Sequence, residues 1–297
     1  MTREALLVTH TGRTDSTAHA RAVAADLMEA GFVVRVNAGE AAELAIPDAV
    51  PVRGPDAAEG VEIVCALGGD GTLLRAAELA RPAKAPLFGI NLGRVGFLAE
   101  AEIADLDRAV RDLVARDYTV DERVTVDVTI EHGGRVVAES WALNEVTVEK
   151  GDRERMIDLL VEVDGRALSR YGCDGVVCAT PSGSTAYAFS AGGPVVWPEV
   201  DALLLVPISA HALFNRALVT APTSTITVTV DPYGAGAVIC CDGRRVFDVA
   251  PGTRATVRRG AVPVRVVRLH PRAFTDRLVA KFGLPVNGWR HRKPMDQ

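Results

Sequence analysis

The sequence predicts an α/β N-terminal domain with a Rossmann-like parallel sheet, followed by an all-β, sandwich-like domain. Apolar runs alternate with helical patterns over the first third of the chain, which is typical of strand–helix repeats. Val- and Thr-rich stretches with period-two alternation continue from residue 120 to about 269, and a helical pattern then returns. We therefore expect domains at 1–119 and 120–269, with a helical segment at 270–297 that packs back on the first domain.

In the first domain, the alternation of strands and helices predicts a parallel sheet covered on both faces. Residues 37–60 carry three prolines and several acidic residues, so we expect a mobile excursion there. Strands are predicted at 5–10, 32–36, 61–67 and 86–91, and helices at 18–30, 73–80 and 103–116.

The second domain is predicted from short alternating strands, with the clearest alternation at 124–130 and 225–230. Turn signals of the His-Gly-Gly, Asp-Gly and Pro-Gly types recur between such stretches. This texture indicates either a sandwich or a barrel. Residues 274–282 then form a helical pattern, which Gly283 and Pro285 end.

Composition limits the kinds of protein that this chain can be. Over 297 residues, 48% are hydrophobic and 24% charged, the balance of a soluble globular protein. The net charge of −5 provides no global basic field, so we expect neither nucleic acid nor a membrane as partner. The first apolar run is too short for a signal peptide, which predicts a cytoplasmic protein. Five cysteines without a Cys-x-x-Cys pair and six scattered histidines predict no protein metal site.

The sequence Leu-Gly-Gly-Asp-Gly-Thr-Leu-Leu at 67–74 is the most informative stretch for function. It follows a buried strand and precedes a helix, where ligands collect in an open α/β sheet. Its glycines let the backbone approach a ligand, and the start of the helix offers free N–H groups to phosphate. Asp70 is placed to accept a proton from an attacking hydroxyl or to hold Mg²⁺. The alternative is a strand-to-helix turn in which Asp70 only caps the helix.

Two further segments are candidates for ligand binding. Residues 172–193 contain a Ser-, Thr- and Gly-rich cluster whose hydroxyls and amides could bind a ribose or phosphate, with Tyr187 against a base. Asn144 and Glu145 lie in the strand-like run 141–148 and should point to opposite faces, so at least one is exposed or paired. A polar turn and an edge strand are the respective structural alternatives. Four arginines are possible phosphate partners, namely Arg75, Arg94, Arg155 and Arg244.

Two common nucleotide-binding motifs are missing from the sequence. The chain contains no Gly-x-x-x-x-Gly-Lys-Ser/Thr sequence, and no Gly-x-Gly-x-x-Gly follows the first strand. By these criteria the chain is neither a P-loop nucleotidase nor an ordinary dinucleotide-binding oxidoreductase.

Several of these segments, taken in order, resemble the NAD kinase family. The resemblance covers most of the chain, and the final segments, 274–279 and 284–289, resemble the family's actinobacterial branch. The matching motifs are Gly-Gly-Asp-Gly-Thr at 68–72, Gly-Ile-Asn-Leu-Gly-Arg-Val-Gly-Phe-Leu at 89–98, Leu-Asn-Glu-Val at 143–146, Asp-Gly at 174–175, Thr-Pro-Ser-Gly-Ser-Thr-Ala-Tyr at 180–187, Gly-Gly-Pro at 192–194 and Cys-Asp-Gly at 241–243.

The resemblance implies a kinase that phosphorylates the 2′-hydroxyl of the adenosine ribose of NAD, forming NADP. It implies ATP or polyphosphate as donor, Mg²⁺ bound mainly through the nucleotide, and a homodimer or homotetramer with active sites between a nucleotide-binding and an NAD-binding domain. Asp70 would be the general base, Asp174 would lie near the nicotinamide, and residues 185–190 would surround the adenine and ribose. The implied binding residues are Gly68, Gly69, Gly71, Thr72, Arg75, Asn144, Glu145, Arg155, Asp174, Thr185, Ala186, Tyr187, Ala188, Phe189, Ser190 and Arg244.

This sequence departs from the commonest family pattern at three positions. Ser182 replaces a frequent Thr and keeps the hydroxyl, whereas Ala217 stands where Pro is usual. Arg244 stands where Gln is common, which puts its contact with ligand in question.

Two alternative functions remain open at this point. Diacylglycerol- and sphingosine-type lipid kinases also carry Gly-Gly-Asp-Gly-Thr before a β-rich domain, although an Asn-Glu pair usually follows closely there. Here Leu-Leu-Arg-Ala follows the loop, and Asn144-Glu145 lies far downstream. The other alternative is a non-catalytic dinucleotide sensor, against which an intact Asp70 argues.

Overall fold

A computed structural model describes residues 2–10, 14–92, 96–152, 155–269 and 273–286. The chain divides into two compact units, one formed by Met1–Asp121 with Arg265–Gln297 and the other by Glu122–Val264. The helix α6 (Phe274–Phe282) therefore belongs to the same unit as the N-terminal strands. Among the described residues, none of the helices combines the length and the hydrophobicity of a membrane span.

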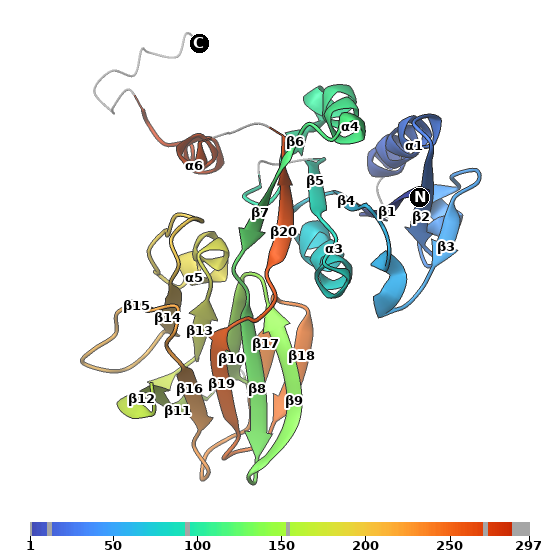
Figure 1. Cartoon of the computed structure of the whole chain (residues 1–297). Helices are drawn as coiled ribbons and strands as arrows, with labels where there is room; N and C mark the ends of the chain where they lie inside the picture. Colours follow the sequence, from blue (N-terminus) through green and yellow to red (C-terminus); the bar gives the residue numbers. More distant parts are fainter. Residues whose placement is uncertain (1, 11–13, 93–95, 153–154, 270–272, 287–297) are drawn as a thin grey trace. The chain divides into compact units, whose positions relative to one another are not determined.

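The first unit is built on a sheet with the strand order β3-β2-β1-β4-β5-β20-β7, in which β6 also pairs with β5 (Figure 1). The pairs from β3 to β5 and the pairs β5–β6 and β5–β20 are parallel. β1 lies between β2 and β4, so the direction of strand addition reverses at β1. The strands are β1 (Arg3–Thr9), β2 (Phe32–Asn37), β3 (Val50–Val52), β4 (Ile63–Leu67), β5 (Leu87–Asn91), β6 (Ala101–Glu102), β7 (Thr119–Arg123) and β20 (Val264–Arg268).

Helices cover both faces of this sheet. The apolar faces of α1 (Thr14–Glu29) and α4 (Leu106–Ala115) share one core with alternate residues of β1, β2, β4 and β5. Helix α3 (Asp70–Ala83) packs on the opposite face, where the glycine at position 89 leaves room for Leu73. The predicted parallel sheet with helices on both faces is thus confirmed.

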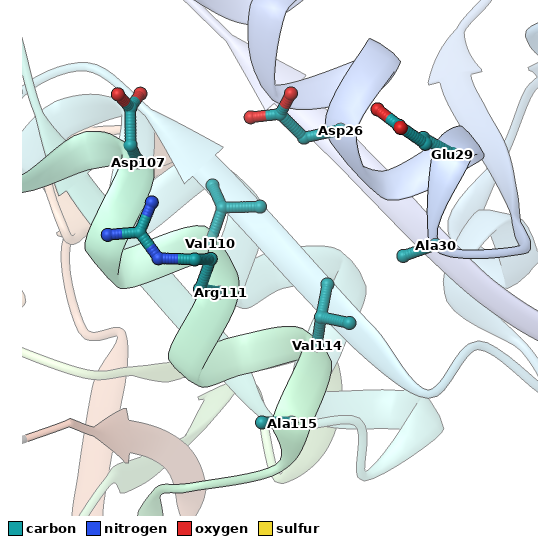
Figure 2. A pocket seen from close by; sticks show the side chains of 8 residues that line it. All are labelled: Asp26, Glu29, Ala30, Asp107, Val110, Arg111, Val114 and Ala115. Atoms are coloured by element: carbon teal, nitrogen blue, oxygen red, sulfur yellow. The ribbon is translucent and has the colours of Figure 1, made fainter.

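A hollow of about 590 Å³ lies between α1 and α4 (Figure 2). It contains none of the residues predicted to bind ligand. Its lining residues are Asp26, Glu29, Ala30, Asp107, Val110, Arg111, Val114 and Ala115.

The segment 37–60, for which we expected a mobile excursion, instead forms ordered elements. It contains α2 (Ala41–Leu44), strand β3 and a 3₁₀ turn, η1 (Pro55–Ala58). Leu44 is fully buried. Pro51 is tolerated because β3 is the edge strand of the sheet, where one missing N–H donor costs no ladder bond.

The second unit is a sandwich of two six-stranded sheets. The first has the order β15-β14-β13-β10-β17-β18 and the second β12-β11-β16-β19-β8-β9. One apolar core contains inward-facing residues of both sheets, among them Val146 and Val176 from the first and Val128 and Leu159 from the second. The sandwich is therefore the correct choice between the two predicted architectures.

The strands of the second unit are short, as the turn spacing predicted. They are β8 (Val126–His132), β9 (Arg135–Ala142), β10 (Glu145–Lys150), β11 (Ile157–Val163), β12 (Arg166–Cys173), β13 (Gly175–Ala179), β14 (Leu203–Ile208), β15 (Leu218–Thr220), β16 (Ile226–Val230), β17 (Ala237–Cys241), β18 (Arg245–Val249) and β19 (Arg254–Arg259).

Part of the outer face of the first sheet is covered by a 3₁₀ turn, η3 (Ser182–Thr185), and the short helix α5 (Tyr187–Ser190). Ala188 packs there in a small core with outward-facing residues of β13 and β14. The same face carries Glu145, because its register partner Ala179 belongs to this small core.

Candidate functional site

The glycine loop of the first unit joins β4 to α3 at the carboxyl end of the sheet. β4 is added beside β1 at the point where strand order reverses, which is where open α/β sheets bind ligands. Gly69 is the N-cap of α3, and Gly69 and Gly71 are exposed. A Cβ at position 68 would overlap the side chain of the buried Thr72, so the glycine allows the loop to pack closely on it. The loop therefore presents exposed backbone N–H groups at the start of a 14-residue helix, a favourable place for phosphate.

Asp70 is the first residue of α3, and the N-cap is Gly69, so Asp70 is not the capping residue. Its carboxylate instead accepts a hydrogen bond from the Leu98 backbone, with 3.3 Å between the nitrogen and Oδ1. A Cβ at position 96 would overlap Oδ1, so Gly96 makes the room that the carboxylate occupies. The half-buried carboxylate is thus held by a segment that lies 28 residues away in the sequence.

Substituting Gly96→Ala is expected to displace the Asp70 carboxylate and to lower kcat of the reaction for which Asp70 is the predicted base. The group in the way is the end of a side chain, so rotation relieves the overlap at little cost in stability. A misplacement of about 1 Å lowers catalytic rates by roughly 10²-fold. Steady-state kinetics and thermal unfolding check both parts. The matched control is Gly151→Ala, whose Cβ would make only ordinary contacts of 3.8 Å. A Gly96→Ala enzyme with unchanged kcat would contradict the assignment.

Arg75 is engaged by the protein itself. Its Nη1 pairs with buried Glu40 at 2.6 Å, and its Nη2 donates to the Thr9 carbonyl at 2.6 Å. Burial raises the pKa of Glu40, while Arg75 and the Thr9 N–H act in the opposite direction. Arg75 therefore ties α3 to the end of β1, and its predicted ligand contact stays a prediction. Arg94 lies outside the described residues.

In the second unit, we expected one strand over the run 141–148, but the structure has two. The run bends at Leu143 and Asn144, between β9 and β10. Asn144 and Glu145 are each only 7% exposed, and Asn144 Oδ1 and Glu145 Oε2 are buried without a hydrogen-bond partner. Buried polar atoms of this kind normally have partners. Two adjacent polar atoms without partners make this bend a candidate place for a ligand.

The bend is held by Asp242, which belongs to a predicted turn and to the Cys-Asp-Gly motif of the resemblance but was not predicted as a site residue. Its Oδ1 accepts the backbone N–H of Asn144 at 2.7 Å and of Glu145 at 3.3 Å, and its Oδ2 accepts that of Leu143 at 2.9 Å. Arg245 pairs with the same carboxylate at 2.9 Å, donates to the Trp141 carbonyl and lies over the Trp141 ring. One buried carboxylate thus fixes three successive peptide units.

The 180–184 segment packs against the same bend. The Thr180 hydroxyl donates to the Leu143 carbonyl at 2.6 Å and accepts the Gly183 N–H at 3.1 Å. A Cβ at position 183 would overlap the Asn144 carbonyl, so only glycine allows this approach. The resemblance motifs at 143–146, 180–187 and 241–243 are therefore brought together in space.

Glu145 is held in an environment that disfavours its charge. Burial, with a smaller contribution from the Asp242 carboxylate, raises its pKa from 4.5 to about 8, although the backbone N–H of Tyr187 acts to lower it. Burial also raises the pKa of the Asp242 carboxyl, but three backbone N–H donors and Arg245 face it and favour its charged form. At neutral pH Glu145 is then mainly a neutral acid, able to donate a hydrogen bond to a ligand oxygen.

This pKa predicts a specific dependence of stability on pH. The folded state binds the Glu145 proton more tightly than the unfolded chain, so its contribution is complete below pH 4.5 and is lost as pH rises through about 8. We compare the free energy of unfolding of the wild type with that of Glu145→Gln. As pH rises from 4.5 to about 8, the difference, wild type minus variant, should decrease by at most ~1.4 kcal/mol per pH unit. Urea unfolding across this range measures the difference. Glu139→Gln, at an exposed glutamate, is the matched control. A flat or rising difference would refute the raised pKa.

Tyr187 and Asp174 extend this group of polar residues. The Tyr187 hydroxyl donates to Glu149 at 3.1 Å, and burial together with Glu149 raises the pKa of Tyr187 to about 12. Lys150 pairs with Asp174 at 2.6 Å and lowers the pKa of that carboxyl. Tyr187 and Phe189 are 37% and 40% exposed, which leaves aromatic surface for a base.

The remaining predicted residues fall into two groups. Around Tyr187, Ser190 is exposed, Thr185 and Ala186 are half-buried, and Ala188 turns its side chain into the small core. Arg155 and Arg244 are exposed, on the turn before β11 and in the β17–β18 hairpin. Their predicted roles in binding stay predictions.

The comparisons with known proteins decide the family. The model of the ATP-NAD kinase N-terminal domain matches residues 6–118, and that of the ATP-NAD kinase C-terminal domain matches residues 143–269. "NAD kinase 2" of Streptomyces avermitilis is 55% identical over 291 residues, 97% of each chain. The chain belongs to the ATP-NAD kinase family. "NAD kinase" of Thermobifida fusca is 55% identical over 98% of this chain and 92% of its own.

Two solved structures are also similar to this member of the ATP-NAD kinase family. An NAD kinase from Archaeoglobus fulgidus in complex with ATP matches with a TM-score of 0.70 and 27% identity, over 94% of this chain and 98% of its own. Yeast NADH kinase complexed with NADH matches with a TM-score of 0.85 over 99% of this chain and 90% of its own, and at 20% identity it supports the fold alone.

Proposed function

We propose that this protein is an NAD kinase, which transfers the γ-phosphoryl group of ATP to the 2′-hydroxyl of the adenosine ribose of NAD. The observation that carries the proposal is the Asp70 carboxylate, held in a glycine loop at the switch point of the sheet, in a chain 55% identical to NAD kinases over nearly its whole length. Inorganic polyphosphate is the alternative donor.

In this mechanism, the exposed N–H groups of Gly69 to Gly71 and the N-terminus of α3 position donor phosphates. The Asp70 carboxylate accepts the proton of the ribose hydroxyl as its oxygen attacks phosphorus. Leu98 holds Oδ1, and Oδ2 is the oxygen that takes the proton. Positioning and fixed dipoles then provide most of the acceleration.

The residues of the second unit bind NAD. Asn144 Oδ1 accepts a hydrogen bond from the ligand, and the protonated Glu145 carboxyl donates one to a ligand oxygen. Tyr187 and Phe189 provide aromatic surface for the adenine. Asp174 lies on the nicotinamide side. Thr185 and Ser190 contribute hydroxyls.

Mg²⁺ is proposed to bind mainly through the donor nucleotide. A metal carried by the triphosphate supplies charge neutralisation on the transferring group.

We further propose a cytoplasmic homodimer or homotetramer. The free cysteines suit a reducing compartment. Large apolar side chains on the second unit, including Leu213, Phe214 and Tyr233, are strongly exposed, as at subunit interfaces. Light scattering of the purified protein measures the subunit number.

Purified protein with NAD, Mg²⁺ and either ATP or polyphosphate tests the activity, with NADP as the measured product. Diacylglycerol and sphingosine, offered in place of NAD, form the comparison arm. NADP formation with either donor supports the proposal. Binding of NAD without NADP formation, or phosphorylation of lipid instead, overturns it.

A further inference from the structure

The C-terminal helix α6 contacts the segment that holds Asp70. Arg277, in the middle of α6, donates through Nη1 to the carbonyls of Phe97 at 3.1 Å and Ala99 at 2.7 Å. Its Nη2 pairs with Glu100 at 2.6 Å. The Arg277 side chain is only 11% exposed, so these bonds are shielded from water. One guanidinium therefore binds three neighbouring residues of a segment that is distant in the sequence.

Glu100 holds the contacts between Arg277 and the segment 97–100 in place. Its side chain is 2% exposed and accepts bonds from both Arg277 and Arg268, each at 2.6 Å. The Glu100 backbone N–H also donates to the Gly89 carbonyl of β5 at 2.9 Å. Removing one partner from a buried ion pair of this kind lowers the stability of the fold strongly, because it leaves a buried charge without its counterion. The side chains are therefore expected to keep this arrangement.

Aromatic packing joins α6 to the same segment. The ring of Phe97 lies with its centroid 5.8 Å from those of Phe274 and Phe282, at the two ends of α6. Both ring pairs are tilted, a favourable aromatic geometry. This packing keeps α6 docked independently of the Arg277 side chain.

The link to Asp70 passes through a single peptide unit. The carbonyl of Phe97 and the N–H of Leu98 belong to one planar group, so fixing the carbonyl fixes the direction of the N–H. Arg277 binds that carbonyl, and the Leu98 N–H donates to Asp70 Oδ1. The Ala99 carbonyl, bound by the same guanidinium, fixes the next peptide unit but one, between Ala99 and Glu100.

From this geometry we infer that Arg277 is a positioning residue for catalysis, which holds the Leu98 N–H toward the Asp70 carboxylate and so sets where the proton acceptor lies. The inference rests on the proposed function, because it acts through Asp70 as base. Helix α6 thereby contributes to the position of Asp70 in the first unit.

The test compares Arg277→Lys and Arg277→Met with the matched variant Arg268→Lys. Lysine keeps the charge toward Glu100 but cannot bind two carbonyls and a carboxylate from one planar fork. Both Arg277 variants should lower kcat by roughly 10- to 100-fold, with KM for NAD within about twofold of wild type. Arg268 pairs with the same Glu100 and also with Asp121, and Arg268→Lys should lower kcat less.

Two readouts separate positioning from a structural role. If Arg277 acts through Asp70, adding Arg277→Lys to Asp70→Asn should change the residual kcat by less than about twofold. Amide hydrogen exchange at Leu98 should also be faster in Arg277→Lys than in the wild type, and this readout requires no activity.

Full kcat in both Arg277 variants, an undiminished effect in the Asp70→Asn background, or unchanged exchange at Leu98 would each overturn the inference. These results differ from failure of the proposed function. Normal turnover of Asp70→Asn would contradict the assignment of Asp70 as general base, whatever the Arg277 variants show. If Asp70→Asn is inactive and both Arg277 variants are fully active, only the positioning role of Arg277 is contradicted.

Discussion

Asp70→Asn should lower kcat for NADP formation by roughly 10²–10⁴-fold, the contribution of a positioned general base. The amide oxygen of asparagine can still accept the Leu98 N–H, so the geometry of the loop is retained. Because the change removes only the proton acceptor, the dissociation constant for NAD should stay within about threefold of wild type. Steady-state kinetics and calorimetric titration with NAD measure the two effects.

The same variant distinguishes a base from a metal ligand. If Asp70 held Mg²⁺, a higher Mg²⁺ concentration would restore part of the rate of Asp70→Asn by mass action. With Asp70 as base, Mg²⁺ does not restore it. Asp107→Asn, at an exposed position of α4, is the control for loss of one carboxylate. Normal turnover in Asp70→Asn would remove the proposed chemistry.

The position of Asp70 could be predicted from the sequence, but its surroundings could not. Three glycines in four positions after a buried strand predict a ligand loop at the carboxyl end of the sheet. Gly96 and Leu98, which define where the carboxylate points, lie on a different segment, and no local pattern connects them to Asp70. Arg277 lies still further along the chain. Tertiary contacts of this kind have no signature in periodicity or spacing.

The errors in the fold have equally local causes. The segment 37–60 was misjudged because its prolines and acids are typical of loops, whereas an edge strand tolerates Pro51. The run 141–148 keeps an apolar pattern through the bend at Asn144, so period-two counting could not find the break. What sets the bend is a carboxylate from the β17–β18 hairpin, almost 100 residues away.

The role of the Asp242 side chain could not be predicted because Asp-Gly is also the usual sequence of a tight hairpin turn. Asp242 and Gly243 have φ values of 54° and 65°, and Arg244 N–H bonds to the Cys241 carbonyl, as in a turn with both central residues left-handed. The turn alone accounts for the sequence pattern. The structure adds that the Asp242 side chain reaches back to three peptide units, a function that Asn or Gly in the same turn would lack.

Asp242→Asn is therefore expected to destabilise the protein and to weaken NAD binding together. Asparagine has one acceptor oxygen in place of two and turns an N–H₂ group toward backbone N–H donors, so the bend at Leu143 to Glu145 loses bonds. The partly buried Arg245 also loses its counterion. Removal of one partner from a buried pair costs about 3–5 kcal/mol, and that range is the expected fall in the free energy of unfolding.

KM for NAD is expected to rise for a separate reason, because Asn144 and Glu145 carry the two unpartnered polar groups that are proposed to bind NAD. Asp248→Asn, on the exposed side of β18, should change the free energy of unfolding by no more than about 0.5 kcal/mol. Urea unfolding and NAD titration of both variants measure the effects. If Asp242→Asn kept wild-type stability and KM, the three N–H bonds would not set the bend. If stability fell while KM stayed normal, the bend would not bind NAD. A loss of both stability and NAD affinity, absent in Asp248→Asn, follows only if one buried carboxylate supports both the hairpin and the groups that bind the ligand.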